Sequence, residues 1–259
     1  MGEWNGQTAV KAQYQNADKL STRISIHSLY STNKTGFGNW IFSHYRLAEG
    51  ARVLELGCGT GEMWRGREET IRKCAQFVLS DFSSGMLSKA RETLSGVGGV
   101  AFEEIDIQDI PYPDDSFDAV IANMMLYHVP DIEKGLRQVR RVFRPGGAFY
   151  CTTYGENGVT KYLCDLFRAY GVENRMNTCF TLQNGESILL RHFDTAEKLM
   201  YPDSLIVTNL DDMADYILSL TGMADFSSLP RETILHVLRR SAVNGALHIP
   251  KEYGLFIAR

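Results

Sequence analysis

VLELGCGTG, residues Val53–Gly61, is the stretch of sequence that decides the fold. Its apolar first half is typical of a buried strand, and its second half places three glycines two positions apart. Glycine lets the backbone turn tightly and lets a ligand come close to it. The stretch therefore predicts a strand that ends in a ligand-binding loop, although an ordinary strand-to-turn junction has the same local pattern.

Strand and helix patterns alternate from Arg52 onward, which is typical of a parallel sheet with helices on both faces. The strands expected in this part are Arg52–Leu56, Gln76–Ser80, Val100–Glu104, Phe117–Asn123 and Gly147–Thr153. The helices expected between them are 62–73, 84–95 and 132–143, the last ending before a turn at Pro145 and Gly146. After Tyr154 we expect helices at 159–170, 181–191, 210–220 and 230–243, and strands at 196–201 continuing through 205–208 and at 253–258.

Four segments are predicted along the chain. Residues 1–50 form an N-terminal helical cap or lid, with helices at 8–20 and 39–47 around a loop at 31–38, although a helix pair packed on the core fits equally well. Residues 51–154 form the ligand-binding core. Residues 155–245 form a mainly helical substrate cap with one sheet strand, and residues 246–259 supply a C-terminal strand that completes the sheet.

Composition excludes several classes of protein. The chain has 259 residues and a net charge of -4, so it lacks the basic surface typical of nucleic-acid binders. Its five cysteines contain no C-x-x-C pair, which argues against a disulfide framework and a structural zinc site. Met1 is followed by Gly-Glu-Trp-Asn and no apolar stretch is long enough to span a membrane, so a cytoplasmic location is predicted.

The acidic residues after the next strands indicate which ligand the loop holds. Glu62 stands where the dinucleotide fingerprint G-x-G-x-x-G needs its third glycine, and no G-x-x-x-x-G-K-[ST] motif is present. Asp81 ends the second expected strand, where a carboxylate can accept hydrogen bonds from both hydroxyls of a ribose. Asp106 follows the third strand and can accept from the amine of an adenine that Ile107 flanks. A ligand that contains ribose and adenine, in a site without a phosphate-binding motif, points to S-adenosyl-L-methionine.

Four stretches together resemble the class I S-adenosylmethionine-dependent methyltransferases: VLELGCGTG, LSDFSSGML, DIQDIPYPDDSFDAVIANMMLYHV and RVFRPGGAFYCTT. The chain is most similar to the small-molecule branch that includes the quinone-biosynthesis methyltransferases. The resemblance covers residues 50 to 153. It implies an α/β fold, with a Rossmann-like, seven-stranded and mostly parallel sheet, helices on both faces, an antiparallel last strand and a helical cap.

The resemblance also implies a set of cofactor-binding residues. It places the loop around the methionine part of the cofactor, Asp81 on the ribose, Phe82 beside the adenine, and Asn123 near the methionine end. The full predicted set is Glu55, Gly57, Cys58, Gly59, Gly61, Asp81, Phe82, Asp106, Ile107 and Asn123, with Glu55 supporting the loop. Asp118 is expected to be structural. The product would be S-adenosyl-L-homocysteine, and no metal site is expected.

The residue that would assist methyl transfer stays open. The sulfonium is already activated, so catalysis can consist mainly of holding the reactants in line. His128 is a candidate general base by position and by its ordinary pKa, but it also fits a packing role, and Tyr14, His27 and Tyr30 are rivals. We expect an enzyme that methylates a small organic acceptor by in-line displacement. The alternatives are a cofactor-binding protein without transferase activity, and a tRNA or protein methyltransferase.

Overall fold

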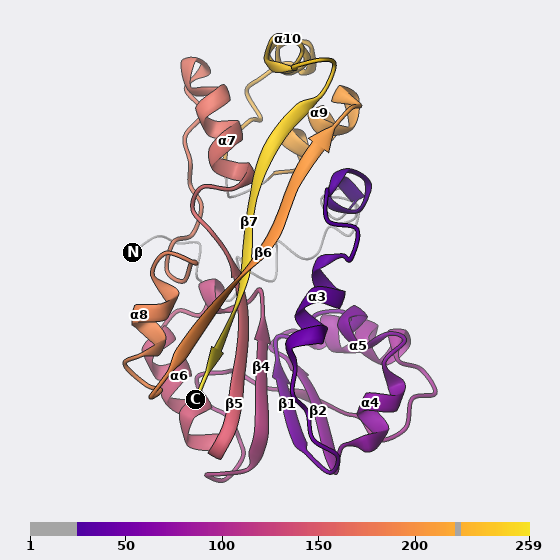
Figure 1. Ribbon diagram of the computed structural model, residues 1–259, viewed down its shortest axis with the longest axis vertical. Coiled ribbons are helices and arrows are strands. Elements are labelled where there is room, and N and C mark those ends of the chain that lie inside the picture. The colour runs from indigo at the N-terminus through magenta and orange to yellow at the C-terminus, as the bar shows by residue number, and fades with distance from the viewer. Residues whose placement is uncertain (1–24, 221–223) are drawn as a thin grey trace. The chain divides into compact units, whose positions relative to one another are not determined.

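The computed structural model describes residues 25–220 and 224–259 (Figure 1). The chain divides into two compact units. Unit 1 contains Met1–Trp40, Tyr154–Thr181 and Met200–Tyr253, and unit 2 contains Ile41–Thr153, Leu182–Leu199 and Gly254–Arg259. The four predicted segments follow the chain rather than these units, and their boundaries stay predictions.

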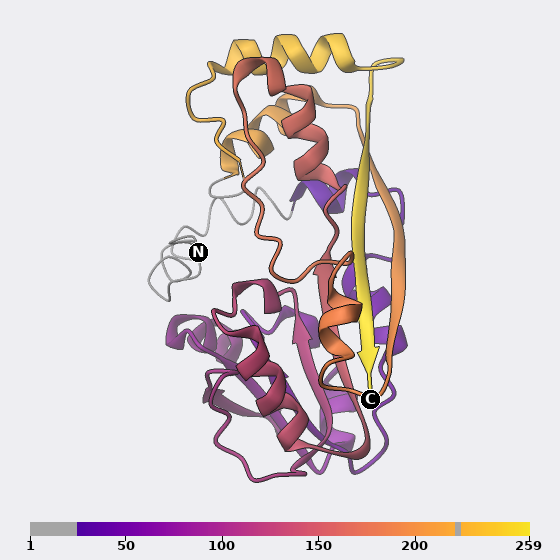
Figure 2. The same ribbon diagram turned by 90° about the vertical axis from the view of Figure 1, so that its left-hand side faces the viewer.

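A seven-stranded sheet in the order β3-β2-β1-β4-β5-β7-β6 runs through the fold. Its strands are β1 (Arg52–Leu56), β2 (Gln76–Asp81), β3 (Ala101–Glu104), β4 (Phe117–Asn123), β5 (Phe143–Tyr154), β6 (Ala196–Val207) and β7 (Leu247–Ala258). β1 to β5 pair in parallel, and the last strands are antiparallel. β6 and β7 lie side by side in both views (Figures 1 and 2). The predicted fold class is confirmed.

Unit 2 is built on apolar strands that are covered on both faces. Four of the five residues of β1 are buried, and so are the middle residues of β2 and β4. Such continuous apolar runs are typical of central strands in parallel sheets. Trp64 is fully buried and packs edge to face on Phe77 of β2, with the ring centroids 4.6 Å apart. The helices of unit 2 are α3 (Phe37–His44, in part), α4 (Glu68–Lys73), α5 (Ser84–Thr93), α6 (Ile132–Val142) and α8 (Gly185–Leu189).

Unit 1 has its own apolar core. α7 (Val159–Leu166), α9 (Leu210–Ser219) and α10 (Arg231–Ser241) gather around one end of β6 and β7 (Figure 2). Each of these helices turns an apolar face inward, as Leu163, Ile217 and Leu238 show by being fully buried. Asn209 caps α9, since its side chain accepts the N–H of Asp211 at 3.0 Å.

One helix prediction in unit 2 is wrong for a backbone reason, and one strand begins earlier than expected. The helix expected at 62–73 is a 3-10 turn, η2 (Glu62–Trp64), followed by α4, because Gly66 between them has a φ of 77° and interrupts helical geometry. The helix expected at 132–143 ends at Val142, and β5 begins directly at Phe143 instead of after a glycine turn. Asp131 starts α6 by accepting the N–H of Lys134 at 2.9 Å.

Other boundaries differ by a few residues. The helix expected at 159–170 is α7 followed by η4 (Arg168–Tyr170), and the helix expected at 181–191 is only α8. The loop expected at 31–38 begins as expected, but α3 starts at Phe37, and residues 25–30 are helical. β7 begins at Leu247, well before the expected Tyr253. The helix expected at 8–20 lies outside the described residues.

Over residues 25–220 and 224–259, no helix has the length and apolar content needed to cross a bilayer. The same residues contain no group of three or more histidine, cysteine or acidic side chains placed to hold a metal ion. All five cysteines are free thiols.

Candidate cofactor site

The glycine loop follows β1, and the end of β2 holds it in place. Asp81, the last residue of β2, accepts the N–H of Gly59 on Oδ2 at 2.9 Å and the N–H of Ser83 on Oδ1 at 2.8 Å. The N–H of Cys58 donates to the carbonyl oxygen of Ser80 at 2.8 Å. The structure thus brings together the loop and the carboxylate that the sequence assigns to one ligand.

The three loop glycines all have positive φ angles, but their surroundings differ. A Cβ at Gly57 would lie 2.9 Å from Cγ of Met125, and one at Gly61 would lie 3.3 Å from Cβ of Ala90 in α5. Packing within the protein therefore requires glycine at these two positions. A Cβ at Gly59, where φ is 56°, would meet no atom within 4 Å. The loop thus leaves open space beside Gly59, which suits a ligand that lies against the backbone.

Glu55 is a buried carboxylate behind the loop. The side chain is 1% exposed, and its oxygens accept hydrogen bonds from Nε1 of Trp64 and from Nδ2 of Asn123, the latter at 3.0 Å. Nδ2 of Asn123 also donates to the hydroxyl of Tyr45 at 2.8 Å. Burial raises the pKa of Glu55 to about 7 despite these hydrogen bonds. Glu55 therefore lies in a network of neutral donors.

Sequence reasoning found Glu55 and Asn123 but missed Trp64 and Tyr45. A charged residue inside an apolar strand must find hydrogen-bond donors when it is buried. An indole three residues past Gly61 is a donor within reach of β1, so a search for partners of Glu55 would have found Trp64. Tyr45 precedes β1 in a segment without any motif, and no sequence signal connects it with Asn123.

The residues predicted at the adenine lie after β2 and β3. Asp106 follows β3, whose last residue Glu104 pairs with Asp81. The carboxylate of Asp106 accepts the N–H of Gln108 at 2.8 Å and is also bound by the Gln108 side-chain amide. Ile107 is 5% exposed and lies near Gly135 of α6, where a Cβ would be 3.4 Å from its Cγ1. Phe82 directly follows β2 and is partly exposed.

His128 lies at the end of η3 (Leu126–His128). Burial lowers its pKa to about 4, so the imidazole is neutral at physiological pH and is a weak base. Its rivals lie elsewhere: the hydroxyl of Tyr30 hydrogen-bonds the carboxylate of Asp212, His27 belongs to unit 1, and Tyr14 lies outside the described residues. No general base is assigned.

A separate cavity of about 440 Å³ lies at the opposite ends of the strands. Residues 46–51, 118–119 and 144–148 line it, at the amino ends of β1, β4 and β5, whereas the glycine loop leaves the carboxyl end of β1. Asp118 lies on its wall, where its carboxylate accepts the N–H of Arg52 at 2.8 Å and pairs with Arg144 at 3.0 Å. This geometry is that of a structural residue.

We compared the chain with models of known protein families, and the match covers the part that contains the glycine loop. Residues 54–151 match the model of a family described as a methyltransferase domain. The match includes the glycine loop, Asp81, Asp106 and Asn123, and it covers all of the residues predicted to bind the cofactor. The predicted resemblance to class I S-adenosylmethionine-dependent methyltransferases is confirmed.

Curated relatives match part of the chain. The chain is 41% identical over 98 residues to a demethylmenaquinone methyltransferase of Clavibacter sepedonicus, a stretch that covers 38% of this chain and 39% of the relative. It is 32% identical over 124 residues to the ubiquinone/menaquinone biosynthesis C-methyltransferase UbiE of Vibrio parahaemolyticus, covering 47% of this chain and 48% of the relative. The chain thus spans less than half the length of these two relatives.

Solved structures extend the likeness in fold. A putative methyltransferase from Bacillus halodurans superimposes with a TM-score of 0.60 at 18% identity, covering 86% of this chain and 98% of that one. At this identity the superposition establishes the fold and nothing finer. The binding role of each residue in the methyltransferase domain, the lid and the cytoplasmic location stay predictions.

Proposed function

We propose that this protein is an S-adenosyl-L-methionine-dependent methyltransferase that acts on a small organic acceptor. The observation that carries the proposal is the glycine loop of the methyltransferase domain. Gly59 donates its N–H to Asp81, and the space beside Gly59 is open. No other glycine of the loop leaves such space. The family match and the curated relatives support the same activity.

Each predicted cofactor residue has a task that its geometry suits. We propose that the loop from Gly57 to Gly61 lies along the methionine part of the cofactor. Asp81 is held by two backbone N–H groups, and the remaining acceptor capacity of its carboxylate would bind the ribose hydroxyls. Phe82, Asp106 and Ile107 would border the adenine. The cofactor supplies an activated methyl group, so the chain itself must chiefly orient an acceptor in line with it.

The acceptor is proposed only as a class. The curated relatives are named for demethylmenaquinone and ubiquinone/menaquinone, and quinone-like rings are therefore one candidate. The matches to those two relatives cover less than half of this chain. A protein that binds the cofactor without transferring methyl groups, and a tRNA or protein methyltransferase, are the alternatives.

Calorimetric titration with S-adenosylmethionine tests the proposal. We expect wild type to bind and Gly59→Leu to weaken binding by at least a hundredfold, because the new side chain would fill the open space. Gly146→Leu is the matched control, since Gly146 also has a positive φ of 81° and no atom near its Cβ position, yet lines the cavity at the amino ends of the strands. Equal affinity in the two variants would show that the ligand does not lie at Gly59.

Turnover separates the alternatives. A methyltransferase should convert S-adenosylmethionine to S-adenosylhomocysteine when a panel of small hydroxyl-, amine- and ring-bearing acceptors is supplied. Tight cofactor binding without any product would favour the non-catalytic alternative, and methylation of tRNA or protein alone would favour the macromolecular one.

A further inference from the structure

Residues Asp106 to Asp109 form a tight turn shortly after β3, within unit 2. The N–H of Asp109 donates to the carbonyl oxygen of Asp106 at 2.9 Å, and Oδ1 of Asp106 accepts the N–H of Gln108 at 2.8 Å. Aspartate at the start of a turn commonly accepts the N–H two residues later, so this stretch folds locally in this way. The turn places the side chain of Gln108 beside the carboxylate that the proposed function assigns to adenine.

The side-chain amide of Gln108 has one orientation that satisfies both of its ends. Oε1 accepts the backbone N–H of Asp131 at 3.1 Å, and an N–H group can only donate. Nε2 therefore faces Asp106, where it lies 3.2 Å from Oδ1 and 3.2 Å from Oδ2. With its own backbone N–H, Gln108 gives three hydrogen bonds to one carboxylate.

The start of α6 holds Gln108 in turn. Asp131 is the N-cap of α6, and its carboxylate accepts a backbone N–H of the first turn at 2.9 Å, so the main chain is fixed where Gln108 binds it. Ile107 is 5% exposed and packs near Gly135 of the same helix, where a Cβ would lie 3.4 Å from its Cγ1. Two consecutive residues of the turn thus contact α6, and the amide of Gln108 passes this fixed position on to the carboxylate of Asp106.

The two carboxylate oxygens of Asp106 are not equally occupied. Oδ1 accepts both the backbone N–H and Nε2 of Gln108, whereas Oδ2 accepts only Nε2 among residues 25–220 and 224–259. A carboxylate oxygen has two lone pairs, so Oδ2 keeps the capacity to accept a further hydrogen bond. The exocyclic amine of adenine donates such a bond. Hypoxanthine has a carbonyl oxygen in the same place, which a carboxylate repels.

We propose that Gln108 is a positioning residue that makes the cofactor site selective for adenine. Gln108 fixes the carboxylate of Asp106 so that Oδ2 is left to accept the adenine amine. The inference rests on the proposed function, because it takes the adenine to lie at Asp106. Gln108 acts through Asp106, so its effect falls on the choice of base and not on the binding of the ribose or the methionine part.

The test compares S-adenosylhomocysteine with S-inosylhomocysteine, which has a carbonyl oxygen in place of the amine. Calorimetry gives the dissociation constant of each ligand with the full-length chain. We expect wild type to prefer S-adenosylhomocysteine by about tenfold or more, the effect of one hydrogen bond to a charged group. Gln108→Met removes the amide at nearly constant length and should reduce the preference to about threefold or less. A purely structural role would weaken both ligands equally and leave their ratio unchanged.

Controls separate this inference from the proposed function. Gln138→Met is the matched control, because Gln138 is a glutamine of α6 that bonds Arg141 and not Asp106, and it should keep the full preference. Gln108→Ala repeats the test with a shorter side chain. Asp106→Ala should abolish the preference.

Each contrary outcome has its own meaning. A preference that is lost in Asp106→Ala but kept in both Gln108→Met and Gln108→Ala would overturn the positioning role and leave the proposed function intact. Equal affinity of wild type for the two ligands, or a preference that survives in Asp106→Ala, would overturn the inference together with the placement of adenine. Failure of wild type to bind S-adenosylhomocysteine would refute the proposed function itself.

Discussion

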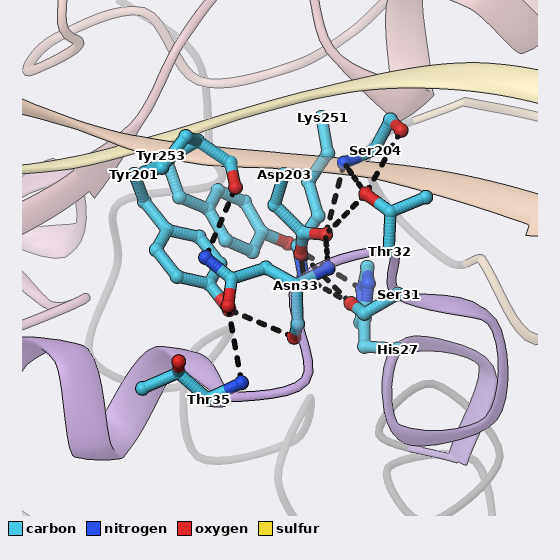
Figure 3. A network of polar contacts seen from close by, with 11 residues as sticks. His27, Ser31, Thr32, Asn33, Thr35, Tyr201, Asp203, Ser204, Lys251 and Tyr253 are labelled. Carbon is cyan, nitrogen blue, oxygen red and sulfur yellow. Dashed lines mark hydrogen bonds and ion pairs between the residues drawn. The ribbon is translucent and has the colours of Figure 1, made fainter.

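Two buried carboxylates, one in each unit, are stabilised in opposite ways. Glu55 in unit 2 receives hydrogen bonds only from neutral groups, and burial raises its pKa to about 7. Asp203 in unit 1 has no exposed side-chain surface but contacts Nζ of Lys251 at 2.6 Å (Figure 3). Burial raises the pKa of Asp203 as well, but hydrogen bonds from Lys251, Asn33 and Ser31 outweigh it and the pKa is lowered. The nature of the partner therefore decides whether a buried carboxyl group stays charged.

The difference matters because each carboxylate holds a different segment of the chain in place. Asp203 accepts the N–H of Asn33 at 3.0 Å and the hydroxyl of Ser31 at 2.8 Å, which fixes the stretch after the helix that contains His27. Glu55 holds Asn123 and Trp64 behind the glycine loop. An ion pair gives the first segment a rigid anchor. Because the pKa of Glu55 is about 7, the charge on the second segment changes with pH near neutrality.

The largest effect is expected from Lys251→Met. Removing one partner of a buried ion pair leaves the other charge without compensation, and we expect a loss of about 3–5 kcal/mol in the free energy of unfolding. Hydrogen exchange measures it locally: protection should fall in the unit 1 parts of β6 and β7 and stay unchanged in β1.

Two controls accompany this variant. Lys161→Met removes an exposed pair with Asp165 and should change stability by no more than about 0.5 kcal/mol. The double variant Asp203→Leu with Lys251→Met removes both charges and should recover much of the loss. An effect of Lys251→Met as small as that of Lys161→Met would refute the anchoring role.

The second effect is a dependence on pH that Glu55 confers on the protein without cofactor. Its folded-state pKa, about 7, lies above the ordinary glutamate value of 4.5, so folding favours the protonated form. The resulting stability is fully present below pH 4.5 and is lost as the pH rises through 7, a change of about 3 kcal/mol for a shift of this size.

Glu55→Gln measures this contribution, because glutamine imitates the protonated acid and does not titrate. The free energy of unfolding of wild type relative to Glu55→Gln should fall between pH 5 and pH 8, as followed by urea denaturation at several pH values. A constant difference across that range would mean that Glu55 has the same pKa in the folded and unfolded chains.

The sequence predicts Glu55 as a site residue but gives no signal for Asp203. The reason is that the hydrogen-bond partners of Asp203 lie far from it along the chain. The glycine loop follows the apolar strand β1, and Asp81 and Asn123 end the apolar strands β2 and β4. The order and spacing of these local patterns predicted both the core of the fold and the candidate site. Asp203 meets Lys251, 48 residues later, and Ser31, 172 residues earlier, and no periodic pattern connects them. Helix ends were missed where one residue decides them, as Gly66 does between η2 and α4.

The smallest losses of stability are expected from removing single hydroxyl groups beside the two carboxylates, Asp203 and Glu55. Ser31→Ala removes a hydroxyl that bonds both members of the ion pair, at 2.9 Å from Lys251 and 2.8 Å from Asp203. Tyr45→Phe removes one neutral acceptor from Asn123, which still donates to Glu55. Hydrogen bonds to charged groups contribute about 1.5–3 kcal/mol and neutral ones about 1 kcal/mol, so Ser31→Ala should destabilise unit 1 more than Tyr45→Phe destabilises unit 2. Hydrogen exchange in β7 and β1 reports the two losses separately. Equal losses would mean that the charge on Asp203 and Lys251 adds nothing to the bonds around them, and the contrast between the two carboxylates would then reduce to their burial.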